Sequence, residues 1–333
     1  MEPSSALEIK PLPHIPRTLR QAALQSQLIP FVGAGVSQLG GCPGWDQFAN
    51  DTLNFFVGHK KLTHAQLSQV KALPSRAKLS FALEMERRCG LSIDFRTLLK
   101  PADEKKEKEG KAVYSNLSRL ATTFVTTNYD ECLDTMPPSS FPAIPQLSSS
   151  AMMAAPRRPF YQQQEIRAEN LDIPNAVFHL HGSINDRKSM VLTTVDYLKR
   201  YASHRPNGDA ERENSFLTFL ELLFSLKNVL FLGYGLNELE ILEYVIQKAN
   251  HAQTRTDEEP RHYIVQGFFS HEIELARSLE IYFRQFGVGL LPFSRDHRDW
   301  AQLADVIEYL AGEIPPGPNL TLPRLNEMEE LLS

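Results

Sequence analysis

The chain has 333 residues, of which 42% are hydrophobic, and its formal net charge is −5. This length and composition allow a substantial buried core, and with no basic stripe in the sequence we expect no nucleic-acid partner. No apolar run approaches the roughly 18 residues that a membrane-spanning helix needs, and residues 1–20 are Pro-rich and lack the apolar core of a signal peptide. We therefore expect a cytoplasmic protein with no membrane partner. The three cysteines are scattered along the sequence, so we expect no structural zinc and no other metal.

Strands and helices are expected to alternate along the chain. Short apolar runs predict strands at 28–32, 124–125, 176–178, 228–232, 262–265 and 288–291. Helices are expected at 17–27, 45–57, 63–70, 76–88, 194–201, 215–226, 238–249, 271–286 and 297–311. Pro30 removes a backbone donor from the first strand, which we expect to begin irregularly. The alternation predicts one Rossmann-like α/β domain over 17–312, with a parallel sheet of about six strands and helices on both faces.

Four segments fall outside this alternation. Residues 1–16 are expected to form an N-terminal arm, and residues of about 58–112 a helical insertion whose charged run, 103–111, is a solvated loop or helix tip. Prolines and serines dominate about 135–172, which predicts an irregular lid or a surface for a partner. Residues 313–333 are expected to form a tail with a short helix.

Four motifs close expected strands. They are Gly33-Ala34-Gly35-Val36-Ser37, Thr127-Asn128-Tyr129-Asp130, His179-Leu180-His181-Gly182-Ser183 and Gly233-Tyr234-Gly235-Leu236. Ligands of an open α/β sheet bind outside the carboxyl ends of its strands, so the four motifs should line one crevice.

The glycine motifs are candidates for binding a phosphate-bearing nucleotide. Glycine allows the backbone to approach a ligand closely, and free N–H groups at Gly33–Ser37 or at the start of a following helix could hold a pyrophosphate. The segment Gly233–Leu236 could be a second backbone site, for an adenosine ribose. The alternatives are a glycine turn without a ligand and the ordinary start of a helix.

The polar motifs are candidates for chemistry at the sugar. Asn128 could orient a ribose hydroxyl or a water, and Asp130 could accept from a carboxamide, unless the two residues only form a turn. His179 and His181 would point the same way if their strand continued, and histidine is the usual group for taking a proton near neutral pH. A core histidine and a metal pair are the alternatives, although no third ligand lies nearby.

Together, in this order, the motifs resemble the sirtuin family, and more closely its zinc-free branch of NAD-consuming effectors in prokaryotic antiphage defence. The resemblance covers about residues 28–310 and implies NAD as the substrate. It implies that Asn128 and His181 are the catalytic residues. It implies the following contacts with NAD: Gly33, Ala34, Gly35 and Ser37 at the pyrophosphate, Thr127 and Asp130 at the nicotinamide end, and Gly233, Tyr234, Gly235 and Leu236 by the adenosine ribose.

The departures from protein-deacylating sirtuins favour a simpler reaction. Deacylases carry a four-cysteine zinc ribbon after the catalytic histidine and a glutamine where this chain has Thr127. We therefore expect an NAD⁺ glycohydrolase that depletes NAD in defence. An NAD- or ADP-ribose-binding regulatory module and a protein deacylase are the alternatives. In related systems such activity is gated by homo-oligomerisation or by a subunit encoded nearby, such as a HerA-type ATPase or a nucleotide-processing protein, so we expect one of these partners.

Overall fold

The computed structural model describes residues 8–101, 103–136, 157–201, 214–235 and 260–314. Its centre is a seven-stranded sheet in the order β3-β4-β2-β1-β5-β6-β7, in which every neighbouring pair is parallel. The strands are β1 Leu28–Val32, β2 Phe124–Thr126, β3 Arg158–Phe160, β4 Ala176–His179, β5 Asn228–Leu232, β6 His262–Phe268 and β7 Val288–Ser294. The predicted Rossmann-like α/β fold is confirmed, with one strand more than expected.

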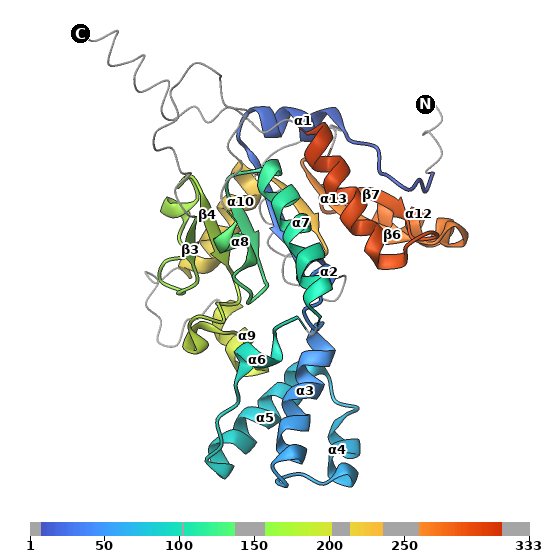
Figure 1. The fold of residues 1–333 in the computed structure, drawn as a ribbon. Helices are drawn as coiled ribbons and strands as arrows, with labels where there is room; N and C mark the ends of the chain where they lie inside the picture. Colours follow the sequence, from blue (N-terminus) through green and yellow to red (C-terminus); the bar gives the residue numbers. More distant parts are fainter. Residues whose placement is uncertain (1–7, 102, 137–156, 202–213, 236–259, 315–333) are drawn as a thin grey trace, which may run out of the picture.

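The helices connect these strands and flank the sheet (Figure 1). They are α1 Arg17–Leu24, α2 Ala34–Leu39, α3 Trp45–Gly58, α4 His64–Val70, α5 Ser75–Cys89, α6 Phe95–Leu98, α7 Glu104–Leu120, α8 Cys132–Thr135, α9 Thr194–Tyr201, α10 Ser215–Leu226, α12 Ile273–Arg284 and α13 Gln302–Glu313. Short 3₁₀ turns lie at Ala168–Asn170, Arg187–Ser189, Ser270–Glu272 and Asp299–Ala301.

Both faces of the sheet are buried, as the apolar strand sequences require. On one face, Phe219 of α10 and Phe283 of α12 belong to the same apolar core as Phe31 of β1. On the other face, α1, α7 and α13 supply a second core that includes Leu117 and Ile307 (Figure 1). The central strand β1 is wholly buried and therefore holds its neighbours, β2 and β5, in a fixed register.

Two details of the strands differ from expectation. Pro30 does not interrupt β1, which pairs with β5 along its whole length. The edge strand β3 lies inside the segment expected to be irregular, because three residues that include Pro159 give too short an apolar pattern to be recognised. Residues 137–156 of that segment, the helix expected at 238–249 and the tail from 315 on lie outside the described residues.

Helices α3, α4 and α5 form a unit at the lower end of the view in Figure 1, away from the sheet. Phe48 and Phe56 of α3 and Leu79 of α5 belong to a third core, which also includes residues outside these helices such as Tyr129 and Met190. The charged run expected as a loop or helix tip is the exposed first half of α7. Helix α7 crosses the end of α2 at two glycines, where a Cβ on Gly110 would lie 2.5 Å from the Cα of Gly40.

Candidate active site

The four motifs follow β1, β2, β4 and β5, which are adjacent in the sheet. Their described residues therefore meet at the carboxyl edge, as expected for an open α/β sheet. Leu236, the last residue of the fourth motif, lies outside the described residues.

The glycine motifs pack directly against one another. A Cβ on Gly33 would lie 2.6 Å from the Gly233 carbonyl oxygen, and a Cβ on Gly233, whose φ is +62°, would lie 2.5 Å from the nitrogen of Val36. The N–H of Gly33 donates to the Leu232 carbonyl (2.9 Å) and the N–H of Gly35 donates to the Gly233 carbonyl (2.8 Å). These two N–H groups are therefore not free, contrary to expectation. The glycines allow α2 to approach the end of β5.

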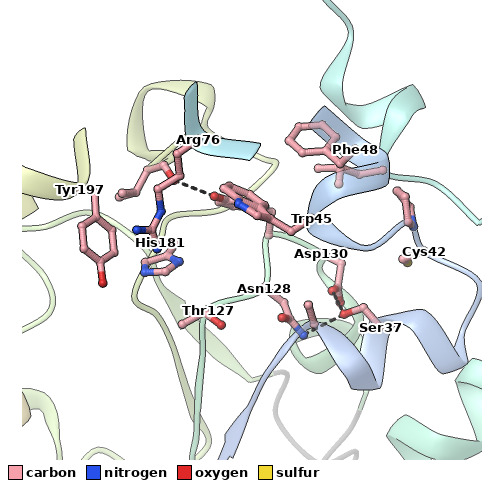
Figure 2. Close-up of a pocket in the computed structure, with 15 residues that line it drawn as sticks. Ser37, Cys42, Trp45, Phe48, Arg76, Thr127, Asn128, Asp130, His181 and Tyr197 are labelled. Carbon is pink, nitrogen blue, oxygen red and sulfur yellow. Dashed lines mark hydrogen bonds between the residues drawn. The ribbon is translucent and has the colours of Figure 1, made fainter. Parts of the chain in front are cut away.

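A chain of hydrogen bonds fixes the side chain of Asn128. Its Nδ2 donates to the Gly33 carbonyl (3.0 Å) and to Ser37 Oγ (2.8 Å), and Ser37 Oγ donates its only proton to Asp130 Oδ2 (2.6 Å) (Figure 2). Because both partners of Nδ2 act as acceptors, the amide has one orientation, which leaves Oδ1 to accept. No donor to Oδ1 is present in the described part of the chain.

Asp130 is the common acceptor at the end of this series of hydrogen bonds. Its Oδ1 accepts from Tyr114 Oη (3.2 Å) and from the backbone N–H of Cys132 (3.1 Å), while Oδ2 accepts from Ser37. Burial raises the pKa of Tyr114 well above its ordinary value, so the phenol stays protonated and can donate. The sequence did not indicate this role for Tyr114, because it lies on α7, outside every motif.

His181 is buried and uncharged. Desolvation by burial, together with the nearby cations Arg200 and Arg76, lowers its pKa from 6.5 to about 3. Its Nε2 lies 2.9 Å from Tyr201 Oη. The ring is therefore unprotonated throughout the neutral pH range.

The two histidines do not act as a pair. Strand β4 ends at His179, so the spacing of a continuing strand does not apply to His181. The ring of His179 is fully buried between Asp134 Oδ1 (2.9 Å) and the Asn128 carbonyl oxygen (3.0 Å). The structure thus separates a core histidine from a cavity-lining one.

Two of the cavities at this edge of the sheet share Ala34, Trp45 and Arg76 in their walls. The first, here called the amide cavity, encloses about 60 Å³ and is lined by residues that include Ala34, Ser37, Trp45, Arg76, Thr127, Asn128, Asp130, His181 and Tyr197. The second, here called the glycine cavity, encloses about 1140 Å³ and is lined by residues that include Ala34, Gly35, Trp45, Arg76, Lys106, Gly233, Tyr234 and Gly235. Together they contain every described residue of the predicted set except Gly33, which is buried behind α2.

Arg76 was not predicted from the sequence. It projects from α5 and lines both cavities, and its guanidinium lies 3.9 Å from the ring centroid of Tyr197 (Figure 2). No carboxylate pairs with it among the described residues. Trp45 of α3 also lines both cavities and stacks on Tyr129. Only the packing of α3 and α5 brings these residues to the strand ends.

Cys42 is the thiol that lines the amide cavity. Burial, with smaller contributions from Asp130 and Glu107, raises its pKa to about 12, so it is protonated at neutral pH. A protonated thiol is a poor nucleophile. In the described ranges no group of three or more histidine, cysteine or acidic side chains is placed to hold a metal ion.

A family model described as a SIR2-like domain matches residues 122–288, about half of the chain. The chain belongs to the SIR2-like family. No curated protein matches it. The SIR2-like match includes Thr127–Asp130, His181 and Gly233–Gly235, whereas Gly33–Ser37 precedes it. Membership implies an activity that involves NAD. None of this SIR2-like protein's described helices is both long and apolar enough to cross a membrane.

Proposed function

We propose that this SIR2-like protein is an NAD⁺ glycohydrolase that converts NAD⁺ and water to nicotinamide and ADP-ribose. The observation that carries the proposal is that Asn128 Oδ1, with no hydrogen-bond donor among the described residues, and the uncharged ring of His181 line one cavity. An oriented acceptor next to a base suits the positioning and deprotonation of a hydroxyl or a water.

In the proposed reaction the bond between C1′ of the ribose and the pyridinium nitrogen breaks. Its electron pair goes to that nitrogen, and the sugar gains oxocarbenium character. Asn128 Oδ1 accepts from the attacking water or from a ribose hydroxyl, and His181 takes the proton as the water oxygen bonds to C1′. Tyr201 would accept from Nε2–H of His181, which leaves the lone pair on Nδ1. The proton then passes to solvent.

The rest of the dinucleotide would occupy the glycine cavity. A diphosphate that links two ribosides would lie where the two cavities meet, beside Arg76 and the first turn of α2. With the N–H groups of Gly33 and Gly35 already bonded, the guanidinium of Arg76 is the stronger candidate for neutralising the phosphates. Ala34 lines both cavities and would offer its backbone N–H there.

The size of the amide cavity supports gating of the reaction. At about 60 Å³ the amide cavity is narrow beside the glycine cavity of about 1140 Å³. A wall of the cavity would therefore move outward before cleavage. We propose that self-assembly, or a partner subunit such as a HerA-type ATPase or a nucleotide-processing protein, drives this opening during antiphage defence.

The decisive experiment measures nicotinamide release from NAD⁺ by the purified protein, with and without the product of the neighbouring gene. His181→Gln and Asn128→Ala should each lower the rate by at least about a hundredfold. His297→Gln, a change at an exposed histidine, is the matched control and should keep the parent rate. Turnover that survives both cavity substitutions contradicts the assignment. NAD⁺ that binds but stays intact supports a regulatory binding module, and release that needs an acylated peptide supports a deacylase.

A further inference from the structure

His179 lies directly behind the proposed catalytic amide. It is the last residue of β4, its side chain is fully buried, and it bridges the segment that carries Asn128 and helix α8. Nδ1 lies 3.0 Å from the backbone carbonyl oxygen of Asn128, and Nε2 lies 2.9 Å from Oδ1 of Asp134 on α8.

The two partners fix the number of protons on the ring. A carbonyl oxygen and a carboxylate oxygen are both acceptors, and a neutral imidazole has only one N–H to donate. Both contacts are satisfied together when His179 is an imidazolium. The second oxygen of Asp134 is buried and has no partner, so His179 donates the one hydrogen bond that this carboxylate receives in the described part of the chain.

The charged groups around the ring favour this state. Burial by itself lowers the pKa of His179, but Asp134, the Asn128 carbonyl and Asp130 together raise it above the ordinary value. Asp134 also interacts electrostatically with Arg157, whose pKa burial lowers to about 10, so it remains a cation at neutral pH.

The hydrogen bond to Asn128 completes the restraint of that residue. Its backbone N–H donates to Thr126 Oγ1 (3.0 Å), its side-chain amide donates to Gly33 and Ser37, and its carbonyl accepts from His179. Loss of the last bond would leave a buried carbonyl without a donor and release the backbone beneath Oδ1. Misplacement of a reacting group by about 1 Å can cost a hundredfold in rate.

We propose that His179 is a positioning residue, held as an imidazolium between Asp134 and Asn128, that sets where Asn128 Oδ1 stands in the amide cavity. Its effect on turnover rests on the proposed function, whereas its protonation state does not. When the ring loses a proton at alkaline pH, the remaining N–H stays on Nε2, where it faces the charged acceptor Asp134, and the contact with the Asn128 carbonyl loses its hydrogen. The rate should therefore fall on the alkaline side as His179 titrates.

Two substitutions separate the contacts. In His179→Asn the amide nitrogen replaces Nδ1, so the donor to Asn128 is kept and the contact with Asp134 is lost. In His179→Gln the amide nitrogen replaces Nε2, so the reverse holds. We expect kcat of the Asn variant within about threefold of the parent and kcat of the Gln variant at least tenfold lower, with KM nearly unchanged. Thermal unfolding of both variants checks that they fold.

A third variant keeps the histidine. Asp134→Asn retains an acceptor for Nε2 but removes the negative charge. The alkaline limb of the pH–rate profile, where the rate falls as His179 loses its proton, should therefore move to lower pH by about one unit or more. If the limb stays where it is in the parent, or if the Gln variant keeps more activity than the Asn variant, the proposal is wrong.

Nitrogen-15 NMR of the free protein tests the protonation state without NAD⁺. The signals of His179 are identified by their loss in His179→Asn, and both ring nitrogens should be protonated at neutral pH. One protonated nitrogen would overturn the proposal. If the parent never cleaves NAD⁺, the proposed function fails, and the side-chain amide signals of Asn128 then replace kcat: they should shift in His179→Gln and stay in place in His179→Asn.

Discussion

The uncharged state of His181 can be tested through the stability of the folded protein. The ring has an ordinary pKa of 6.5 when the chain is unfolded and a pKa of about 3 in the folded protein, where burial, Arg200 and Arg76 oppose its charge. A lowered histidine pKa means that the unfolded state binds the extra proton. Stability from this group is therefore complete above about pH 6.5 and is lost as the pH falls toward 3.

The size of the loss follows from the two pKa values. At about pH 5 the unfolded His181 binds a proton with a ratio of roughly 30 to 1, while the folded ring stays neutral. The free energy of unfolding therefore falls by about 2 kcal/mol between pH 7.5 and pH 5 because of this residue alone.

His181→Gln provides the reference. Its amide can keep the contact with Tyr201 but does not titrate, so the variant lacks this part of the pH dependence. Urea denaturation of both proteins at about pH 7.5 and 5 should show the stability difference changing by about 2 kcal/mol in favour of the variant at the lower pH. The titration of His179, which has the opposite sign, is common to both proteins and cancels. A change below about 0.5 kcal/mol would refute the buried, neutral base.

Two further outcomes are expected, for the glycine contact and for the cation at the junction of the cavities. Gly233→Ala places a Cβ 2.5 Å from the nitrogen of Val36 at a residue with a positive φ, and it should lower the free energy of unfolding by more than about 2 kcal/mol in urea titrations. The control is Gly312→Ala in α13, where a Cβ meets open space, and this change should be neutral or stabilising. Arg76→Met should weaken ADP-ribose binding about tenfold, measured by calorimetry, and should make the affinity depend less on salt concentration. The control is Arg88→Met, an exposed change on the same helix, which should leave both the affinity and its salt dependence unchanged. Equal affinities for the two variants would show that Arg76 does not contact the phosphates.

The sequence predicted the sheet well because the information is local. Each of the six expected strands is a short apolar run, and the motifs that follow four of them mark the carboxyl edge. The strand at Arg158–Phe160 was not predicted, because three residues with a central proline give no recognisable apolar pattern, and the strand is stabilised by its pairing with a neighbouring strand. Pro30 led to the wrong prediction of an irregular start to β1, which keeps its register with β5 although Pro30 lacks a backbone N–H donor.

The contents of the site were less predictable because they depend on contacts between distant segments. Asn128 and His181 were predicted from their place after strands, but the partners that orient the first or shift the pKa of the second lie on helices far along the chain. Arg76 is carried by α5, and Tyr114 reaches Asp130 from α7. The role of Gly33 changed for the same reason, because its neighbour in space is Gly233.

The contact between Gly40 and Gly110 has a consequence for how relatives of this protein vary. Helix α2 carries Ser37 and is only six residues long, and it is wedged between the Gly233 loop at its start and α7 at its end. A methyl group on Gly110 would collide with backbone, which cannot rotate away, so the helix as a whole would shift and carry the Ser37 hydroxyl with it. Relatives should therefore keep glycine at positions 40 and 110 although neither lines the amide cavity, and a deep mutational scan should find both positions as intolerant of side chains as Asn128 and His181, the proposed catalytic residues, are of replacement.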